Sequence, residues 1–344
     1  MAEYGVGIVG MGWVAGEHMR AWHANPHSEV VGVVSRTREG AQRKIEEVGI
    51  PAKIYSSYEE LLADPNVHIV SICTPPHLHV EQATAAAQAG KHICLEKAIA
   101  TDLESLRRLR DAIRAAKVKT VVSFVLRWNP MFEIVKAQLK DGTIGRVFYA
   151  EADYYHGIGP WYGQFSWNIK KSVGASSLLS AGIHAVDALR WFVGSEATEV
   201  RAFSTRSNHP PFDAYEYDPT QVQIIKFENG VIGKVASSIE NISPYVFNVF
   251  LLGDQGTIKD NLIWSPKKFP GQTSWAEVPT ILPVSGDVTH HPFQAEIDHF
   301  VDCILNDVES HTNVEDAVKS HELALASDLS AKRGGEAVKL PLLD

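Results

Sequence analysis

The sequence predicts an α/β chain of two domains, an N-terminal doubly wound parallel sheet and a C-terminal α+β domain with an antiparallel sheet. Over residues 1–125, short apolar strands alternate with amphipathic helices, which is typical of a parallel sheet covered by helices. After residue 125, successive strand-like runs are joined by the turn signals ENG and GDQG, which indicate antiparallel hairpins. A length of 344 residues also suits two domains better than one.

The elements of the first domain follow from apolar runs and their boundary residues. Ser57 with Glu60, and Thr101 with Glu104, have the spacing of a capping box at the start of a helix. Gly90 is a stop signal for the helix before it. We predict strands at 4–9, 29–35, 68–75, 92–98 and 120–125, and helices after the first glycine-rich turn and at 56–64, 79–90 and 103–117.

The second domain changes from alternating elements to consecutive strands. We place the domain boundary near residue 125, with domains 1–125 and 126–344, and the last helices can pack back on the first domain. The predicted order is a helix at 130–141, a strand at 146–156, a helix at 176–191, strands within 199–206, 221–241 and 246–264, and helices at 293–306 and 314–331.

Composition narrows the class of protein. The formal net charge is −9 and the isoelectric point is about 5.9, so a nucleic acid or an anionic membrane is a disfavoured partner. No apolar run approaches the ~18 residues of a membrane span. The chain enters a strand directly, without the pattern of a signal peptide, and its three cysteines show no metal-binding spacing. We therefore expect a cytoplasmic protein.

A glycine-rich turn follows the first strand. GMGWVA matches the G-x-G-x-x-G/A pattern with Gly10, Gly12 and Ala15, in the strand–turn–helix context that makes this pattern specific. Gly10 permits a tight turn, and Gly12 lets the backbone approach a pyrophosphate at the helix N-terminus. The alternative is a plain turn in an α/β domain. The motif favours a dinucleotide cofactor.

The end of the second strand bears on which dinucleotide binds. NAD-binding domains usually place a carboxylate there for the ribose 2′-hydroxyl, whereas this chain has Ser35, Arg36 and Arg38. A hydroxyl and two guanidinium groups suit a 2′-phosphate. The alternative is an exposed turn with incidental arginines. We expect NADP to be preferred over NAD.

The helix SSLLSAGIHAVDALRW, residues 176–191, carries polar groups on an apolar background. Ser180, His184, Asp187 and Trp191 are spaced by four, three and four residues, so a regular helix places them on one face. A histidine can accept or donate a proton near neutral pH. The alternative is a histidine that is hydrogen-bonded within the core.

Several motifs in order identify a resemblance. They are GIVGMGWVA at the start, TPPHLH at 74–79, LEKAIA at 95–100, GASSLLSAGIHAVD at 174–187, PFQAEIDHFVDCI at 292–304 and SDLSAKRGGEAVKLP at 327–341. Through them the chain resembles, over essentially its whole length, the Gfo/Idh/MocA family of glucose–fructose oxidoreductase, inositol dehydrogenase and MocA-like oxidoreductases. The resemblance implies a Rossmann domain, a second domain with a large, mostly antiparallel open sheet, and a homo-dimer or homo-tetramer associated through that sheet.

The resemblance also implies the reaction and its groups. Family members oxidise or reduce secondary alcohols of sugars and polyols with NAD(P). Lys97 matches the family lysine, and we expect it to stabilise a developing alkoxide, with its pKa lowered by burial. His184 is the expected general base.

Two positions depart from the family pattern. Ala98 replaces the proline that usually follows Lys97, and Ser180 replaces an aspartate four residues before the histidine. Ser180 can still hydrogen-bond substrate or water. Asp187 either orients His184 in place of that aspartate or pairs with Arg190 on the helix surface.

Further contacts are expected from the matched motifs and from an aromatic, polar stretch at 153–171. The expected cofactor contacts are Gly10, Met11, Gly12, Trp13, Val14, Ser35, Arg36, Arg38, Cys73, Thr74, Pro75, Pro76, His79, Glu96, Lys97, Arg127 and Trp167. The expected substrate contacts are Lys97, Tyr155, His156, Trp161, Lys171, Ser180, His184 and His291. His290 and His291 lack a carboxylate at a diagnostic metal-site spacing, so we expect no metal.

The sequence thus favours an NAD(P)-dependent oxidoreductase acting on a secondary alcohol of a sugar, sugar derivative or polyol. Two alternatives remain. One is a redox-neutral enzyme that cleaves or eliminates a glycoside with tightly bound nicotinamide cofactor, which the change at Ser180 makes plausible. The other is a non-catalytic nucleotide-sensing regulator, against which Lys97 and His184 argue.

Overall fold

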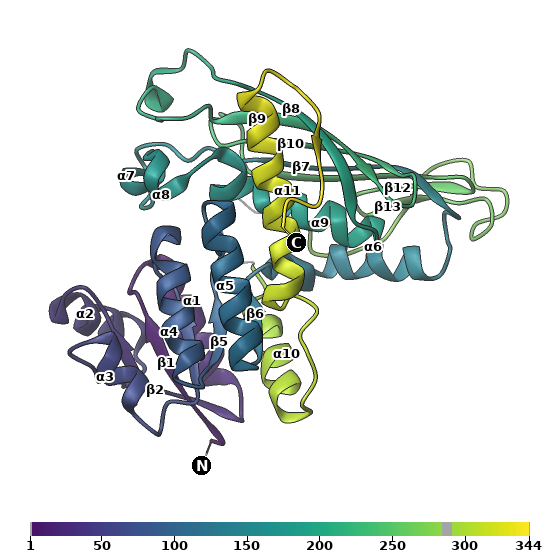
Figure 1. Ribbon diagram of the computed structural model, residues 1–344. Helices are drawn as coiled ribbons and strands as arrows, with labels where there is room; N and C mark the ends of the chain where they lie inside the picture. The colour runs from purple at the N-terminus through teal and green to yellow at the C-terminus, as the bar shows by residue number, and fades with distance from the viewer. Residues whose placement is uncertain (1, 284–290, 344) are drawn as a thin grey trace. The chain divides into compact units, whose positions relative to one another are not determined.

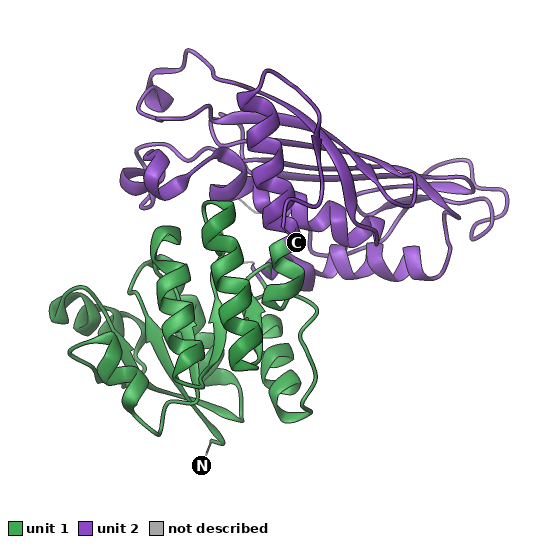
Figure 2. Cartoon of the chain, in the orientation of Figure 1, with its two compact units in different colours: residues 1–124, 292–318 green, residues 125–291, 319–344 purple. Residues whose placement is uncertain are grey.

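A computed structural model describes residues 2–283 and 291–343, in two compact units (Figure 2). Unit 1 comprises residues 1–124 and 292–318, and unit 2 comprises residues 125–291 and 319–344. The first change of unit thus falls at residue 124, where the sequence change suggested a boundary near 125. Residues 292–318 cluster with unit 1; the sequence analysis placed them in domain 126–344 and allowed its last helices to pack back on the first domain.

Unit 1 is built on a six-stranded parallel sheet (Figure 1). The spatial order is β3 (Lys53–Ile54), β2 (Ser28–Val34), β1 (Tyr4–Val9), β4 (Ile69–Ile72), β5 (His92–Leu95) and β6 (Thr120–Val122). The strand order changes direction between β1 and β4, which is where doubly wound sheets bind ligands. The predicted doubly wound fold is confirmed, although β4, β5 and β6 each end three residues earlier than predicted.

The helices of unit 1 are α1 (Trp13–Ala24), α2 (Arg38–Val48), α3 (Tyr58–Ala63), α4 (His79–Gln88), α5 (Leu103–Ala116) and α10 (Phe293–Leu305). The predicted cap of α3 is confirmed, because the Ser57 hydroxyl accepts a hydrogen bond from the Glu60 amide at 3.1 Å. The predicted cap of α5 is wrong by one residue. Asp102 caps it, since its carboxylate accepts from the Ser105 amide at 2.8 Å.

Unit 2 is built on a nine-stranded, mostly antiparallel sheet, as the family resemblance implies. Its only parallel pair in the described residues is β7 with β10, and the ENG and GDQG turns join β9 to β10 and β11 to β12 in hairpins. The spatial order is β14 (Ala276–Glu277), β13 (Leu262–Trp264), β12 (Gly256–Lys259), β11 (Val246–Gly253), β7 (Val147–Tyr155), β10 (Ile232–Ser238), β9 (Thr220–Phe227), β8 (Ala197–Thr205) and β15 (Val338–Lys339).

Helices α6 (Pro130–Lys140) and α9 (Ile183–Val193) lie on one side of this sheet (Figure 1). Two short helices, α7 (Phe165–Asn168) and α8 (Lys171–Gly174), precede α9, and α11 (Val314–Lys332) contributes residues from 319 onward to unit 2. Helix α9 packs on β7 and β10.

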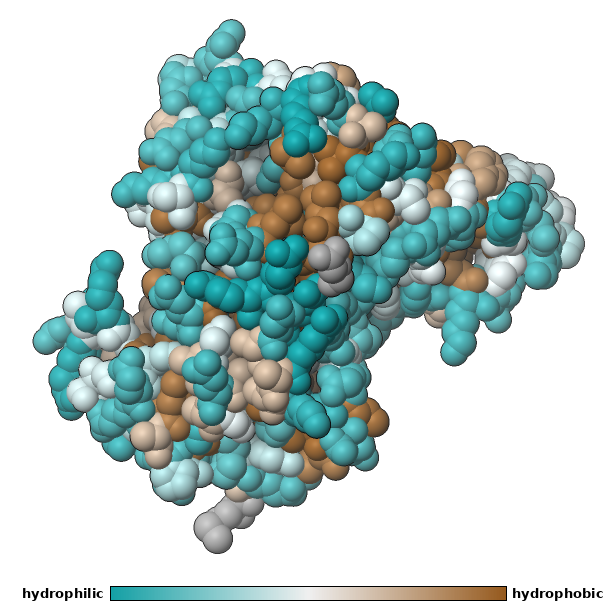
Figure 3. Space-filling view, in the orientation of Figure 1, coloured by the Kyte–Doolittle hydropathy of each residue, from teal (hydrophilic) through white to brown (hydrophobic). Residues whose placement is uncertain are grey.

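The other face of the sheet exposes apolar side chains. Phe203 of β8 lies opposite Val222 of β9, and Ile224 is the next exposed residue along β9. Figure 3 shows the molecule in the orientation of Figure 1, where hydrophobic areas on the surface are separated by hydrophilic residues. The expected association of copies through this sheet stays a prediction.

The predicted helix 176–191 contains a change of helix type. Residues Leu178–Gly182 form a π-helical turn, η3, and α9 begins directly after it. At Gly182 a Cβ would lie 2.3 Å from the Ser237 hydroxyl of β10, so glycine permits this close approach of helix and sheet. The prediction assumed one regular α-helix, whereas Ser180 lies in the π-helical turn and His184 in the α-helix that follows it.

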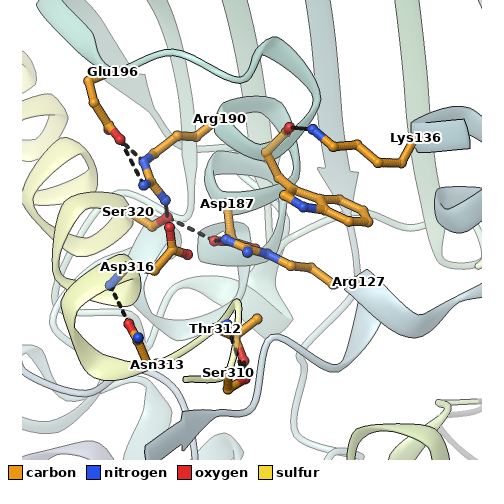
Figure 4. A network of polar contacts seen from close by, with 11 residues as sticks. Arg127, Lys136, Asp187, Arg190, Glu196, Ser310, Thr312, Asn313, Asp316 and Ser320 are labelled. Atoms are coloured by element: carbon orange, nitrogen blue, oxygen red, sulfur yellow. Dashed lines mark hydrogen bonds and ion pairs between the residues drawn. The ribbon is translucent and has the colours of Figure 1, made fainter. Parts of the chain in front are cut away.

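A buried ion pair anchors α9 (Figure 4). The Arg127 Nε and a terminal guanidinium nitrogen donate to the two Asp187 carboxylate oxygens at 2.7 and 2.6 Å. The Ser320 hydroxyl of α11 donates to the same carboxylate at 2.8 Å. Arg127 is 3% and Asp187 2% exposed. This arrangement joins α9, α11 and the segment before α6.

The two guanidinium hydrogen bonds give Asp187 a partner, Arg127, that neither sequence interpretation included, and Arg190 pairs with Glu196 at 2.7 Å (Figure 4). The physical reason is that a buried carboxylate needs a fully matching partner, and the planar guanidinium of Arg127 supplies two parallel hydrogen bonds.

The buried pair yields a stability prediction. Asp187→Asn leaves the Arg127 charge buried without its carboxylate, which costs about 3–5 kcal/mol of unfolding free energy. Asp218→Asn is the control, because its pair with Arg206 has side chains 41% and 43% exposed and such pairs contribute about 0–1 kcal/mol. Calorimetry should show a much larger fall in Tm for the first variant, and equal falls would contradict the assignment.

Candidate active site

The loops after β1 and β4 meet at the carboxyl edge of the parallel sheet in unit 1. Gly10 has φ +87°, a conformation that favours glycine. A Cβ at Gly10 would lie 2.8 Å from the Cys73 carbonyl oxygen and 2.8 Å from the Thr74 methyl group. Gly10 is thus required both for the backbone turn and for the contact with the neighbouring strand end.

The N-terminus of α1 opens onto free space. Gly12 is its N-cap and provides no side-chain cap, and apart from Gly12 and its two chain neighbours no described residue has an atom within 4 Å of where its Cβ would be. Trp13 is exposed, and Met11 and Val14 are half-buried around it. Amide groups at such a terminus favour an anion. The residues therefore fit the pyrophosphate of a dinucleotide, as the motif predicts.

The loop after β2 presents cationic and hydroxyl groups. Arg36 and Arg38 are exposed and Ser35 is half-buried. Thr37 caps α2 by accepting from the Gly40 amide at 3.1 Å, which fixes the start of the helix beside these residues. Residues 34–38 contain no carboxylate.

The buried His79 ring connects the loop after β4, at Thr74, with the loop after β5, at Ala98. Its ring is fully buried, with Nδ1 2.7 Å from the Ala98 carbonyl oxygen and Nε2 2.6 Å from the Thr74 carbonyl oxygen. Both ring nitrogens are engaged with backbone and the ring is enclosed. The expected contact of His79 with cofactor is corrected accordingly: His79 supports Thr74, Pro75 and Pro76, which remain the candidate contacts.

Glu96 and Lys97 follow β5 at the same edge of the sheet. Burial lowers the pKa of the Lys97 ammonium, and the neighbouring Glu96 carboxylate opposes that shift. Glu96 is itself buried and lies 3.1 Å from His18 Nε2. Lys97 thus combines a depressed pKa with an adjacent anion, as expected of a group that stabilises negative charge and exchanges protons.

In unit 2, His184 lies near the start of α9 against the sheet. It is 6% exposed, and its ring stacks with that of Tyr154 at 6.3 Å between centroids. His156 is two residues along the chain from Tyr154, and their ring centroids are also 6.3 Å apart. The structure therefore brings His156 and His184 around one tyrosine.

The sequence analysis named Tyr155 as a substrate contact and did not name Tyr154, but the structure places Tyr154 beside His184. Adjacent side chains in a strand point to opposite faces. Tyr154 therefore shares the face of His184, whereas Tyr155 lies on the other face, near Asp153 and Lys234. The sequence shows that alternate residues of this strand point to opposite faces of the sheet, but it does not show which of the two sets faces α9.

The aromatic stretch after β7 divides into packed and exposed residues. Tyr162 and Phe165 pack against a buried cluster that contains Tyr215 and Tyr217. The remaining expected contacts are more open: Trp161 and Lys171 are exposed, and Trp167 and His291 are half-buried. His290 lies outside the described residues. Residues 2–283 and 291–343 contain no group of three His, Cys, Asp or Glu side chains that could hold a metal.

A carboxyl group absent from our sequence analysis lies near Ser180. The Tyr217 hydroxyl, which donates to the Asn168 carbonyl oxygen at 2.7 Å, interacts electrostatically with Ser180 and with the charge of Asp328, which α11 supplies. Burial raises the pKa of Asp328 to about 7, while hydrogen bonds with Ser176 and Gln221 oppose the rise. Only the fold brings this residue, 148 positions from Ser180, to the neighbourhood.

In the part of the chain that the structure describes, no helix is both long and apolar enough to cross a membrane. The expected cytoplasmic location stays a prediction.

Family models match both units. The model described as "Oxidoreductase family, NAD-binding Rossmann fold" matches residues 4–124, and that of the "GFO/IDH/MocA C-terminal domain" matches residues 132–259.

Curated relatives span most of the chain. Levoglucosan dehydrogenase of Pseudarthrobacter phenanthrenivorans is 27% identical over 69% of this chain and 68% of its own length. The scyllo-inositol 2-dehydrogenase (NAD(+)) of Bacillus subtilis is 27% identical over 90% of this chain and 88% of its own.

A solved structure of levoglucosan dehydrogenase in complex with NADH and L-sorbose has the same fold, with a TM-score of 0.89, 23% identity and coverage of 99% of this chain and 100% of the other. Because the two family models follow one another along the chain and the site motifs fall within them, the protein belongs to the Gfo/Idh/MocA family of oxidoreductases.

Proposed function

We propose that this protein is an NAD(P)-dependent oxidoreductase that transfers hydride between the nicotinamide and a secondary alcohol of a sugar, sugar derivative or polyol. The observation that carries the proposal is Lys97, with its lowered pKa, at the same sheet edge as the open N-terminus of α1. Relatives named for levoglucosan and inositol support the substrate class.

The chain's own residues would hold the cofactor and manage the proton. Gly10, Gly12 and the first amides of α1 would bind the pyrophosphate. The bound nicotinamide supplies the hydride acceptor or donor. Lys97 would stabilise negative charge on the substrate oxygen, and His184 would take the hydroxyl proton, or return it in the reverse direction.

We further propose that the cofactor is NADP in preference to NAD. The support is local: Arg36 and Arg38 are exposed beside Ser35, and residues 34–38 hold no carboxylate that would repel a 2′-phosphate. The family model's description names NAD, so cofactor choice is a separate question from the fold and needs its own test.

The catalytic assignment is tested by Lys97→Ala and His184→Ala. Each should lower kcat by about 10²–10⁴-fold, because each removes charge stabilisation or proton transfer. Steady-state kinetics on an active polyol is the measurement. The controls should retain activity. They are Lys259→Ala, at the exposed end of β12, and His23→Gln, on the exposed side of α1. A near-normal kcat in either site variant would refute its role.

The cofactor assignment is tested by titrating NADP and NAD separately. Arg36→Ala and Arg38→Ala should each weaken NADP binding roughly 10- to 100-fold, since a charge-assisted hydrogen bond contributes roughly 1.5–3 kcal/mol. NAD binding should change little. Arg43→Ala, further along α2 and exposed, is the matched control. Wild-type protein that binds NAD as tightly as NADP would overturn the preference.

A further inference from the structure

Three buried polar side chains in unit 2 have no hydrogen-bond partner among the described residues. Both amide atoms of Gln223 are without a partner, and so are the hydroxyls of Ser237 and Ser177. Their exposed fractions are 1%, 0% and 0%. Buried polar groups are nearly always hydrogen-bonded, because burying an amide or a hydroxyl without a replacement for its bonds to water is costly. These side chains therefore point to a hydrogen-bonding ligand.

The register of the sheet places two of them on one face. Gln223 of β9 lies opposite Val235 of β10, and Ser237 is two residues further along β10. Side chains two apart on a strand point to the same face of a sheet. Ser237 is therefore the diagonal neighbour of Gln223 on that face, at a spacing that long side chains can reach across.

This face of the sheet lies against η3. A Cβ at Gly182 would lie 2.3 Å from the Ser237 hydroxyl oxygen, so Ser237 meets the end of the π-helical turn. Ser177 is five residues before Gly182 and immediately precedes the turn. Because a π turn relates residues five apart, Ser177 lies on the same side of the helix as Gly182. The unpartnered groups thus face the layer between η3 and the sheet.

The same layer adjoins the candidate proton-transfer group. Ser237 lies beside Tyr154 in the parallel pair of β10 and β7, and the Tyr154 ring stacks with that of His184 at 6.3 Å between centroids. The turn η3 leads directly into α9, which carries His184 in its first turn. A ligand held by Ser237 would therefore support the point from which α9 starts.

Burial and the available donors and acceptors define the kind of ligand. A sugar or polyol does not reach side chains as enclosed as Gln223 and Ser237, and these neutral groups give an ion no counter-charge. Water is small, both donates and accepts, and typically makes about three hydrogen bonds when buried. The Gln223 carbonyl oxygen and amide group and the Ser237 hydroxyl supply such bonds.

We propose that unit 2 contains an internal water-binding site beneath the π-helical turn, formed by Gln223 and Ser237 with Ser177 at its edge. The bound water connects β9 and β10 with the turn that leads into α9. This site goes beyond the proposed function and does not depend on it.

Gln223→Met gives opposite results for a hydrated and a dry site. Methionine is unbranched and of similar length but cannot replace the amide. If water binds, the substitution removes its main partner and leaves Ser237 unsatisfied, so Tm should fall by about 2–4 °C in calorimetry. Gln88→Met, at the exposed end of α4, is the control and should leave Tm unchanged. A rise in Tm, as expected when an unsatisfied buried amide is removed, or an unchanged Tm would overturn the proposal.

A double variant shows whether the two side chains share one ligand. Ser237→Ala alone should also lower Tm, but it should add little to Gln223→Met, because the shared water is already lost. Ser265→Ala is the matched control, since the Ser265 hydroxyl is 0% exposed and donates directly to the Thr143 carbonyl oxygen at 2.6 Å. Its effect should add fully to that of Gln223→Met. Full additivity for Ser237→Ala as well would show that no common water binds.

A measurement on the wild-type protein needs no substitution. A crystal structure should show an ordered water at about 2.7–3.2 Å from the Ser237 hydroxyl and from a Gln223 amide atom. A direct hydrogen bond between the two side chains, or the lack of any density between them, would contradict the proposal. None of these measurements needs turnover, so an inactive wild-type protein would refute the proposed function and leave this inference standing.

Discussion

A carboxylate buried at the end of a central parallel strand is the constraint on which the site in unit 1 depends. Removing Glu96 from water is costly unless charge and hydrogen bonds replace its hydration. His18 Nε2 lies 3.1 Å from a Glu96 carboxylate oxygen, and the charge of Lys97 also lowers the pKa of Glu96. The consequence is structural as well as electrostatic. Helix α1 presents Gly12 at its uncapped N-terminus and His18 in its interior, so one helix contributes both to the proposed cofactor site and to the buried contact with Glu96.

In unit 2 a second buried carboxylate, Asp187, is also paired with a cation, and this pair holds α9 in place. Helix α9 carries His184 on an apolar background, and the Arg127–Asp187 pair anchors the helix one turn further on. Ser320 and the hydrogen bond from Lys136 Nζ to the Trp191 carbonyl fasten the helix at other points. The close contact at Gly182 brings the preceding π turn against the sheet. His184 is thus carried by a helix that is anchored at several points, as its proposed role in proton transfer requires.

The parts of this protein that sequence analysis predicts are those with local causes. Alternating elements indicated the parallel sheet, ENG and GDQG indicated the hairpins, and Gly10 and Gly12 indicated the tight turn that leads into α1. The errors have distant causes. Asp187 meets Arg127 from 60 residues away, and Asp328 reaches the Ser180 neighbourhood only through the packing of α11. Tyr154 and Tyr155 differ by one position, and only the strand's orientation in the sheet decides which of them meets His184. The sequence does not single out His18, because its partners Ser71 and Glu96 come from β4 and from the end of β5 and become neighbours only in the folded chain.

The most direct test of the central claim is the absorbance of reduced nicotinamide after purified protein is mixed with a panel of sugars and polyols, with NADP and NAD supplied separately. The account predicts substrate-dependent formation of the reduced cofactor with at least one polyol or sugar, and loss of that signal in Lys97→Ala. No net reduction across the panel, with nicotinamide remaining on the protein through gel filtration and glycosides being cleaved, would contradict it and indicate a redox-neutral reaction.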